Sequence, residues 1–169
     1  MLIVFGGLPG TGKTTLAALL ARERRATWLR IDAIEQVLRS SGMLRGDVGP
    51  SGYMVAYALA EANLRQGQGV IADCVNPLGV TRAAWRGVAA AASSPILEVE
   101  VVCSDPVEHR RRVETRPIDL PGLVRPSWDS VQRQAYEPWA GPRIVLDTAG
   151  RSIAQAAAEL RARIDAAAA

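Results

Sequence analysis

The sequence has few of the residues on which disulfide-stabilised and metal-centred proteins depend. Its 169 residues include two cysteines, one histidine and one lysine. Cys74 and Cys103 fall in or beside apolar segments and lack the paired spacing of a metal site, so we expect buried free thiols in a reducing compartment. His109 lies among charged residues in "VEHRRRVET", and we expect it to be exposed on the surface rather than catalytic.

Long hydrophobic runs and internal repeats are also missing. The apolar start, "LIVF", is too short to span a membrane and lacks the basic segment of a signal peptide. The net charge of +3 is mild and arginine is spread along the chain, which gives little indication of nucleic-acid binding. We therefore expect one soluble, cytoplasmic domain over residues 1–169, with no membrane partner.

A glycine-rich segment, "GLPGTGKTT", follows directly on the first apolar run. The spacing of Gly7, Gly12, Lys13 and Thr14 is that of a phosphate-binding P-loop, whose backbone N–H groups converge on phosphate oxygens at the start of a helix. Lys13 is the only lysine beside nineteen arginines, and its compact ammonium suits a phosphate as a point charge. The segment predicts an ATP site formed by Gly7, Leu8, Pro9, Gly10, Thr11, Gly12, Lys13, Thr14 and Thr15, with Thr14 as a Mg²⁺ ligand.

Apolar segments alternate with helical patterns along the rest of the chain. Strands are predicted at 2–5, 27–31, 69–74, 96–102 and 143–146, and helices at 14–24, 32–40, 53–66, 80–92, 105–116 and 152–164. This alternation predicts an α/β fold in which helices cover both faces of a parallel sheet. Ligands of such sheets bind at the carboxyl ends of the strands, so functional side chains are expected there.

Asp32 follows the second predicted strand and has two interpretations. Beside a γ-phosphate, its carboxylate could orient an acceptor hydroxyl and take its proton as a general base. Alternatively, Asp32 with Glu35 three residues later forms a helix N-cap and its capping-box partner. The neighbouring P-loop favours the catalytic interpretation.

Asp73 ends the third predicted strand, in "VIADCVNP". An aspartate in this position beside a P-loop typically serves Mg²⁺ or its bound water, so Asp73 is the second predicted metal residue. This assignment requires the third strand to lie next to the first. Asn76, Pro77 and Arg82 follow on the loop and helix beyond it, and "DCVNP" alone would be an ordinary turn.

An arginine-rich helix runs into a proline-rich stretch, and residues 110–127 are predicted to form a lid. Arg112 and Arg116, one turn apart, could neutralise the charge that develops during phosphoryl transfer. The alternative is a solvated basic face paired with Glu108 and Glu114. Aromatic residues in "SWDSVQRQAYEPW" are interpreted mainly as packing.

Two loops are candidates for ligand recognition. Residues 39–53 are glycine-rich and are predicted to face the acceptor, with Arg39, Arg45, Asp47 and Tyr53 as candidate contacts. The segment "LDTAG" (146–150) could pack beside a nucleotide base or simply turn into the last helix.

Taken together, these motifs resemble the AAA_33-like small P-loop kinases, a superfamily that includes polynucleotide kinase, gluconate kinase, chloramphenicol phosphotransferase and zeta toxins. The resemblance implies a three-layer α/β/α P-loop fold with a five-stranded parallel sheet in the order 2-3-1-4-5 and a lid. It also implies ATP, Mg²⁺ and transfer of the γ-phosphate to a hydroxyl. Lys13 and Thr14 would match the phosphate and metal positions, Asp32 the general base, and Arg112 and Arg116 the lid arginines.

One position departs from this likeness. Polynucleotide kinase carries an arginine three residues after the base aspartate, where this chain has Glu35. An acidic residue there would repel a phosphate, which disfavours a 5′-hydroxyl nucleic acid as the acceptor. The first hypothesis is therefore an ATP-dependent kinase of a small hydroxyl-bearing molecule. The alternatives are a nucleotide-gated binding module with slow ATP hydrolysis, a nucleic-acid kinase, and a toxin-like kinase of nucleotide sugars.

Overall fold

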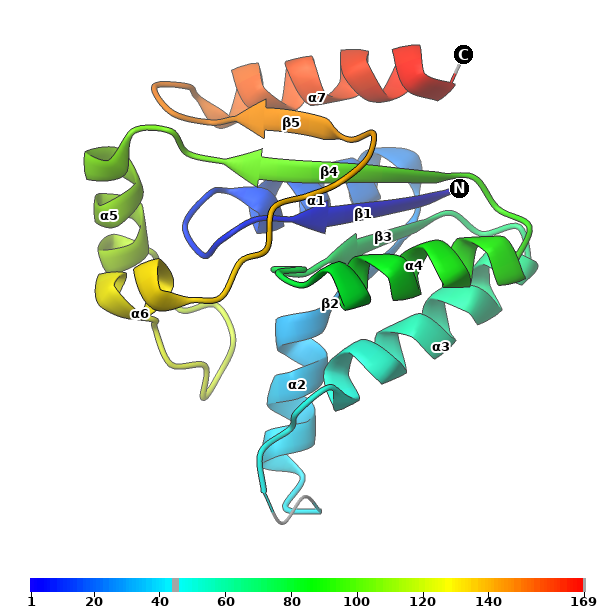
Figure 1. The fold of residues 1–169 in the computed structure, drawn as a ribbon, viewed down its shortest axis with the longest axis horizontal. Coiled ribbons are helices and arrows are strands. Elements are labelled where there is room, and N and C mark those ends of the chain that lie inside the picture. The colour runs from blue at the N-terminus through cyan, green and yellow to red at the C-terminus, as the bar shows by residue number, and fades with distance from the viewer. Residues whose placement is uncertain (44–45, 169) are drawn as a thin grey trace.

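The computed structural model describes residues 1–43 and 46–168 of the chain (Figure 1). The predicted acceptor-side residue Arg45 lies outside the described residues. Among the residues described, no helix combines the length and apolar character needed to cross a membrane.

The five strands form one parallel sheet in the order β2-β3-β1-β4-β5, which confirms the predicted order. Their bounds are β1 (Leu2–Gly6), β2 (Thr27–Arg30), β3 (Val70–Asp73), β4 (Ile96–Val102) and β5 (Ile144–Asp147). The register places Asp73 opposite Phe5 on one side and Arg30 on the other. The third strand thus lies beside the first, as the interpretation of Asp73 requires.

Helices cover both faces of the sheet and make the three-layer α/β/α sandwich that the sequence predicts. The helices are α1 (Lys13–Arg24), α2 (Ile31–Ser40), α3 (Ser51–Arg65), α4 (Gly79–Ala91), α5 (Pro106–Thr115), α6 (Trp128–Arg133) and α7 (Ile153–Ala168). Side chains of α1 and α7 fill the core on one face, and those of α3 and α4 fill it on the other. Alternate residues of the central strands β1 and β3 therefore enter different cores, which explains why these two strands are almost continuously apolar.

Three helices surround the carboxyl ends of the strands rather than a face of the sheet. In Figure 1, α5 and α6 lie beyond the tips of the strand arrows, and α2 projects from the end of β2. Helix α6 is not among the predicted helices. Its N-cap residue Ser127 accepts a hydrogen bond from the Ser130 amide at 3.1 Å, and Val131 is buried. Helices α5 and α6, which lie at the two ends of the arginine-rich and proline-rich region, are therefore both at the carboxyl ends of the strands.

Candidate active site

The P-loop has a backbone shape that needs glycine at three positions. Gly7, Gly10 and Gly12 have φ angles of 136°, 86° and 92°. A Cβ at Gly7 would clash with the Val101 carbonyl, and one at Gly10 would lie 2.6 Å from the Val113 side chain. Helix α1 starts at Lys13, and its first amides are free of any side-chain cap from the described residues. These amides can therefore bind an anion.

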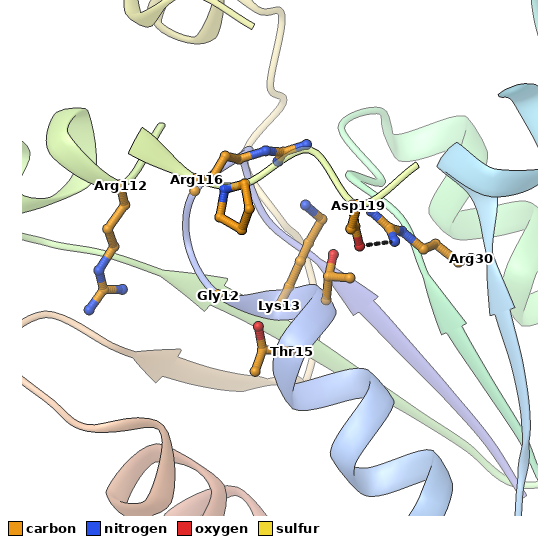
Figure 2. Close-up of a pocket in the computed structure, with 10 residues that line it drawn as sticks. Gly12, Lys13, Thr15, Arg30, Arg112, Arg116 and Asp119 are labelled. Carbon is orange, nitrogen blue, oxygen red and sulfur yellow. Dashed lines mark hydrogen bonds and ion pairs between the residues drawn. The ribbon is translucent and has the colours of Figure 1, made fainter. Parts of the chain in front are cut away.

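A cavity of about 220 Å³ lies over the P-loop. Its lining contains five charged side chains, and the described residues around it are Gly10, Gly12, Lys13, Thr14, Thr15, Arg30, Arg112, Arg116, Pro117 and Asp119. Lys13 is only 5% exposed, and Figure 2 shows its ammonium pointing into this space beneath Arg116. The cavity thus offers loop amides and guanidinium and ammonium groups, which is the chemistry that recognises phosphates.

The two predicted lid arginines have different positions. Arg116 lies just past the end of α5 and extends over Lys13, whereas Arg112 points away from Lys13 in Figure 2. Arg112 donates to the Thr148 hydroxyl at 2.8 Å, to its carbonyl at 2.9 Å and to Glu108 at 2.8 Å. The Thr148 hydroxyl in turn donates to the carbonyl of Thr11. Arg112 therefore connects α5 to the P-loop through the segment after β5.

A second cavity of about 240 Å³ adjoins the first on the side of α7. Gly12, Thr15 and Arg112 border both cavities, and Thr148 and Arg151 complete this side of the second one. The "LDTAG" segment contributes Thr148, which is buried. The two cavities are thus adjacent along the start of α1, and together they could hold the triphosphate chain and the base of a nucleotide.

An ion pair that the sequence analysis did not find closes one side of the phosphate cavity. The Arg30 guanidinium binds both carboxylate oxygens of Asp119, at 2.5 and 3.0 Å (Figure 2). These hydrogen bonds hold the pKa of Asp119 below its usual value. Arg30 is the last residue of β2. Its position at the carboxyl end of a strand was the sequence feature that could have identified it as a site residue. Nothing in the proline-rich stretch distinguishes Asp119.

Thr14 and Asp73 lie together at the floor of the site. The Thr14 hydroxyl donates to Asp73 Oδ1 at 3.2 Å, and Asp73 Oδ2 is buried and accepts no hydrogen bond from the described residues. Burial raises the pKa of Asp73, and nearby Asp32 adds to the effect while Lys13 opposes it. The described residues contain no cluster of three or more His, Cys, Asp or Glu side chains able to hold a metal. A hydroxyl and a buried carboxylate with a free oxygen still fit Mg²⁺, which keeps several waters and needs few protein ligands.

Asp32 is not the N-cap of α2, so the capping-box interpretation is wrong. The helix begins one residue earlier, at Ile31, and its N-cap is Arg30, with no side-chain cap. Glu35 pairs with Arg39 at 3.0 Å instead of reaching back to the helix start. The helix starts early because Ile31 is buried in the core next to β2. Asp32 is left half-buried at the end of the sheet.

A third cavity of about 520 Å³ opens beside Asp32. It is enclosed by α2, α3 and α4, with Gln134 from the segment after α6. Tyr53 borders it, and its hydroxyl accepts a hydrogen bond from the Asn76 amide at 3.0 Å. Arg39 contacts Glu35 at the cavity rather than lining it. Asp47 adds its charge near Glu35.

His109 is buried, not exposed, and this expectation is wrong. Its Nε2 lies 2.8 Å from the carbonyl oxygen of Pro9, and its ring meets Trp128 edge-on at 5.1 Å. Helix α5 packs against the P-loop through the close approach of Val113 to Gly10, and this packing covers the imidazole. The histidine thus positions the P-loop against α5.

Arg82 is also buried and has a structural place. It donates to the carbonyls of Glu137 and Pro138 at 3.0 and 3.3 Å, and its guanidinium lies 4.8 Å from the centre of the Trp139 ring. These contacts hold the segment after α6 against α4. Both cysteines are buried free thiols, as predicted.

The sheet order, the P-loop between β1 and α1, and the aspartate at the end of β3 define the P-loop kinase fold. The chain belongs to the AAA_33 family of AAA domains, the model of which matches residues 2–136. Among curated proteins, none matches the sequence significantly.

Solved structures, several of them kinases, share this fold over nearly the whole chain. The APS kinase CysC of Mycobacterium tuberculosis, in complex with AMPPNP and APS, is 21% identical with a TM-score of 0.69, covering 97% of this chain and 96% of that one. A sugar kinase from Janibacter sp. HTCC2649 is 20% identical with a TM-score of 0.70, covering 97% and 94%. Kti12 of Chaetomium thermophilum, in complex with ADP-AlF3, is 24% identical with a TM-score of 0.63, covering 98% of both chains. At these identities the likeness establishes the fold.

Proposed function

We propose that the protein is an ATP-dependent phosphotransferase that moves the γ-phosphate to a hydroxyl of a small molecule. The observation that carries this proposal is the position of Asp32. Its carboxylate borders the 520 Å³ cavity and lies close enough to Asp73 and Arg30 to influence the pKa of both. A carboxylate between a phosphate site and a separate cavity is where a general base for an acceptor hydroxyl belongs.

In the proposed reaction, the acceptor hydroxyl gives its proton to Asp32 and its oxygen forms a bond to the γ-phosphorus. The bond from that phosphorus to the bridging oxygen breaks, and ADP leaves. Lys13, the P-loop amides and Arg116 stabilise the transferring phosphoryl group, while Arg112, which borders the same cavity, holds α5 to the P-loop through Thr148. Mg²⁺, held by Thr14 and through water by Asp73, would neutralise phosphate charge. Residues 110–127 act as the lid over this site.

Two observations support a kinase over a nucleotide-gated binding module: the similar solved structures, and the finding that Asp32 does not cap α2. The solved structures with this fold include a kinase, the APS kinase CysC, in complex with AMPPNP and APS, and Kti12 in complex with ADP-AlF3. Because Asp32 does not cap α2, its carboxylate is available for the acceptor. A nucleic-acid acceptor is disfavoured because Glu35 lies in the same cavity. Slow hydrolysis without transfer is the competing outcome that an experiment must separate.

The test measures ADP release from ATP and Mg²⁺, alone and with a panel of sugars, nucleosides, nucleotide sugars, aryl and alkyl alcohols and 5′-hydroxyl oligonucleotides. One acceptor class should stimulate release, and Asp32→Asn should reduce that stimulation by about 10²-fold or more while ATP-analogue affinity stays within about two-fold. Asp129→Asn, which removes an exposed carboxylate of α6, is the matched control and should retain full activity. Slow ADP release that no acceptor stimulates and that Asp32→Asn does not change would reject the kinase proposal.

A further inference from the structure

The cavity beside Asp32 is large enough for a whole acceptor molecule. Its volume of about 520 Å³ lies within the usual range of small-molecule sites, roughly 300–1,000 Å³. Its walls are mostly apolar side chains, including Tyr53, Met54, Tyr57, Leu78 and Val80. The phosphate cavity, by contrast, is lined mainly by charged and small polar residues. The two spaces therefore suit different parts of the reaction.

Part of the apolar wall of this cavity is exposed. Met54 is 63% exposed and Val80 is 71% exposed, and both border the cavity. Tyr53 and Tyr57 stand 6.0 Å apart between ring centres along the same wall. Ligands with aromatic or other apolar rings bury such surface and stack favourably on tyrosine rings.

Three hydroxyl groups of the wall already form hydrogen bonds within the protein. The Tyr53 hydroxyl accepts from the Asn76 amide, and the Tyr57 hydroxyl lies 3.2 Å from the Thr81 carbonyl, to which it donates. The Thr81 hydroxyl donates to Asn76 at 2.8 Å. A sugar or other polyol needs many hydrogen-bonding partners when it is buried, and apart from Asp32, Glu35 and the Gln134 amide the wall is apolar or already hydrogen-bonded.

The charge of the cavity is negative. Asp32 and Glu35 line it, and no lysine, arginine or histidine does so among the described residues. Burial raises the pKa of Glu35, against the effect of its partner Arg39, and Asp32 and Asp47 add to the rise. These carboxylates would repel a negatively charged ligand placed in the cavity.

Each of the three helix N-termini at the cavity has a carboxylate of the protein beside it, and that of α2 has Asp32 in its own first turn. The Gly79 amide at the start of α4 donates to Glu137 Oε2 at 2.6 Å. At the start of α3, Glu35 packs so closely on Gly52 that a Cβ there would clash with it. The positive ends of these helices are therefore not free to bind a phosphate or carboxylate of a ligand.

We propose that this cavity binds an apolar, ring-bearing alcohol without negative charge, and that this alcohol is the phosphate acceptor. The inference rests on the proposed function, because the hydroxyl must face Asp32. It separates this chain by substrate class from relatives that act on anionic acceptors such as APS. A neutral or a positively charged alcohol fits the site, whereas nucleotides, phosphorylated sugars and hydroxy acids do not.

The test compares binding of compounds that share one ring and differ in charge, measured by titration calorimetry with AMPPNP present. 3-Phenylpropan-1-ol is neutral, phenylalaninol is cationic and 3-phenyllactate is anionic, and glucose serves as the polyol. We expect the neutral and cationic alcohols to bind at least about ten-fold more tightly than phenyllactate, with glucose weakest. Equal or tighter binding of phenyllactate or glucose, or no binding of any ring compound, would overturn the inference.

Two variants assign the binding to this cavity. Glu35→Gln should improve phenyllactate affinity several-fold and leave 3-phenylpropan-1-ol unchanged. Glu61→Gln is the matched control, because Glu61 forms the same i,i+4 pair with Arg65 on α3 that Glu35 forms with Arg39 on α2. Ala84→Phe should fill the cavity and abolish alcohol binding while AMPPNP still binds, which shows that the variant is folded.

These measurements fail separately from the proposed function, since they need no turnover. If the alcohols bind as expected but are never phosphorylated, the cavity stands as an alcohol-binding site, and the alcohol's role as acceptor falls together with the kinase proposal. If phosphorylation occurs with an anionic or polyol acceptor instead, the kinase proposal stands and the cavity inference is wrong. Unchanged alcohol binding in Ala84→Phe would likewise overturn the location of the site.

Discussion

Replacing Asp119 by asparagine should strengthen the binding of ATP. Asp119 holds the Arg30 guanidinium with two hydrogen bonds at the edge of the phosphate cavity. A guanidinium binds a carboxylate and a phosphate with the same fork of N–H groups. In the structure described, Asp119 therefore occupies a group that a phosphate could use and adds a negative charge beside it.

The expected gain follows from the exposure of the pair. Two unit charges about 4 Å apart interact by about 1 kcal/mol in water and by about 4 kcal/mol at an effective dielectric constant of about 20. The Asp119 side chain is 52% exposed, whereas Arg30 is 9% exposed, so the lower value applies. A gain of about 1 kcal/mol corresponds to roughly five-fold tighter binding. Loss of the half-exposed pair should cost about 1 kcal/mol of folding stability or less.

The assay is a titration with a fluorescent ATP analogue at low and high salt. Asp119→Asn should lower the Kd about five-fold at low salt, with a smaller gain at high salt because solvent ions screen the charge. Asp129→Asn again serves as the control, since it removes one exposed carboxylate outside the cavity and changes the net charge equally. An unchanged or higher Kd for Asp119→Asn, or an equal gain in the control, would refute the reasoning.

Three further predictions concern stability and reactivity. Because Arg30 lowers the pKa of Asp119 in the folded protein, their pairing should stabilise the protein fully above about pH 4, and this stabilisation should be lost as the pH falls through the lowered pKa. Melting temperatures measured across acid pH should show this loss in the wild type and not in Asp119→Asn. Trp139→Ala removes the ring under Arg82 and should lower the free energy of unfolding by about 3–5 kcal/mol in urea titrations, so a change under 1 kcal/mol would contradict the packing described. Burial raises the pKa of the Cys74 thiol, so at pH 8 this residue should react with a thiol reagent far more slowly in the folded protein than in urea, as peptide mapping of the labelled chain would detect.

Much of the fold was predictable because it depends on local patterns. The five strands begin and end within one residue of the predicted ranges, since each is a short run rich in apolar and β-branched residues, and the central β1 and β3 are buried on both faces. The P-loop was predictable because its spacing reflects backbone geometry that only glycine adopts easily. The six predicted helices are all present, because each is long enough to show a periodic apolar pattern in the sequence. The short helix α6 has too few residues to show such a pattern.

The rest depends on contacts between distant parts of the chain. His109 is surrounded by charges in the sequence, but packing of α5 on the P-loop buries it. The spacing of Asp32 and Glu35 matches a capping box, but the helix starts one residue earlier, at the buried Ile31, so Asp32 is not its cap and Glu35 pairs with Arg39. The pairing of Arg30 with Asp119 joins residues 89 positions apart, and no local pattern predicts it. These tertiary contacts determine the chemistry available at the site.

The proposed phosphoryl transfer is tested most directly by identifying where the γ-phosphate goes. ³¹P NMR of a reaction with ATP, Mg²⁺ and an apolar alcohol distinguishes a phosphate monoester from inorganic phosphate. We predict a monoester of the alcohol that accumulates together with ADP in the wild type and is absent with Asp32→Asn. Inorganic phosphate as the sole product across the acceptor panel, formed equally by both proteins, would contradict the account.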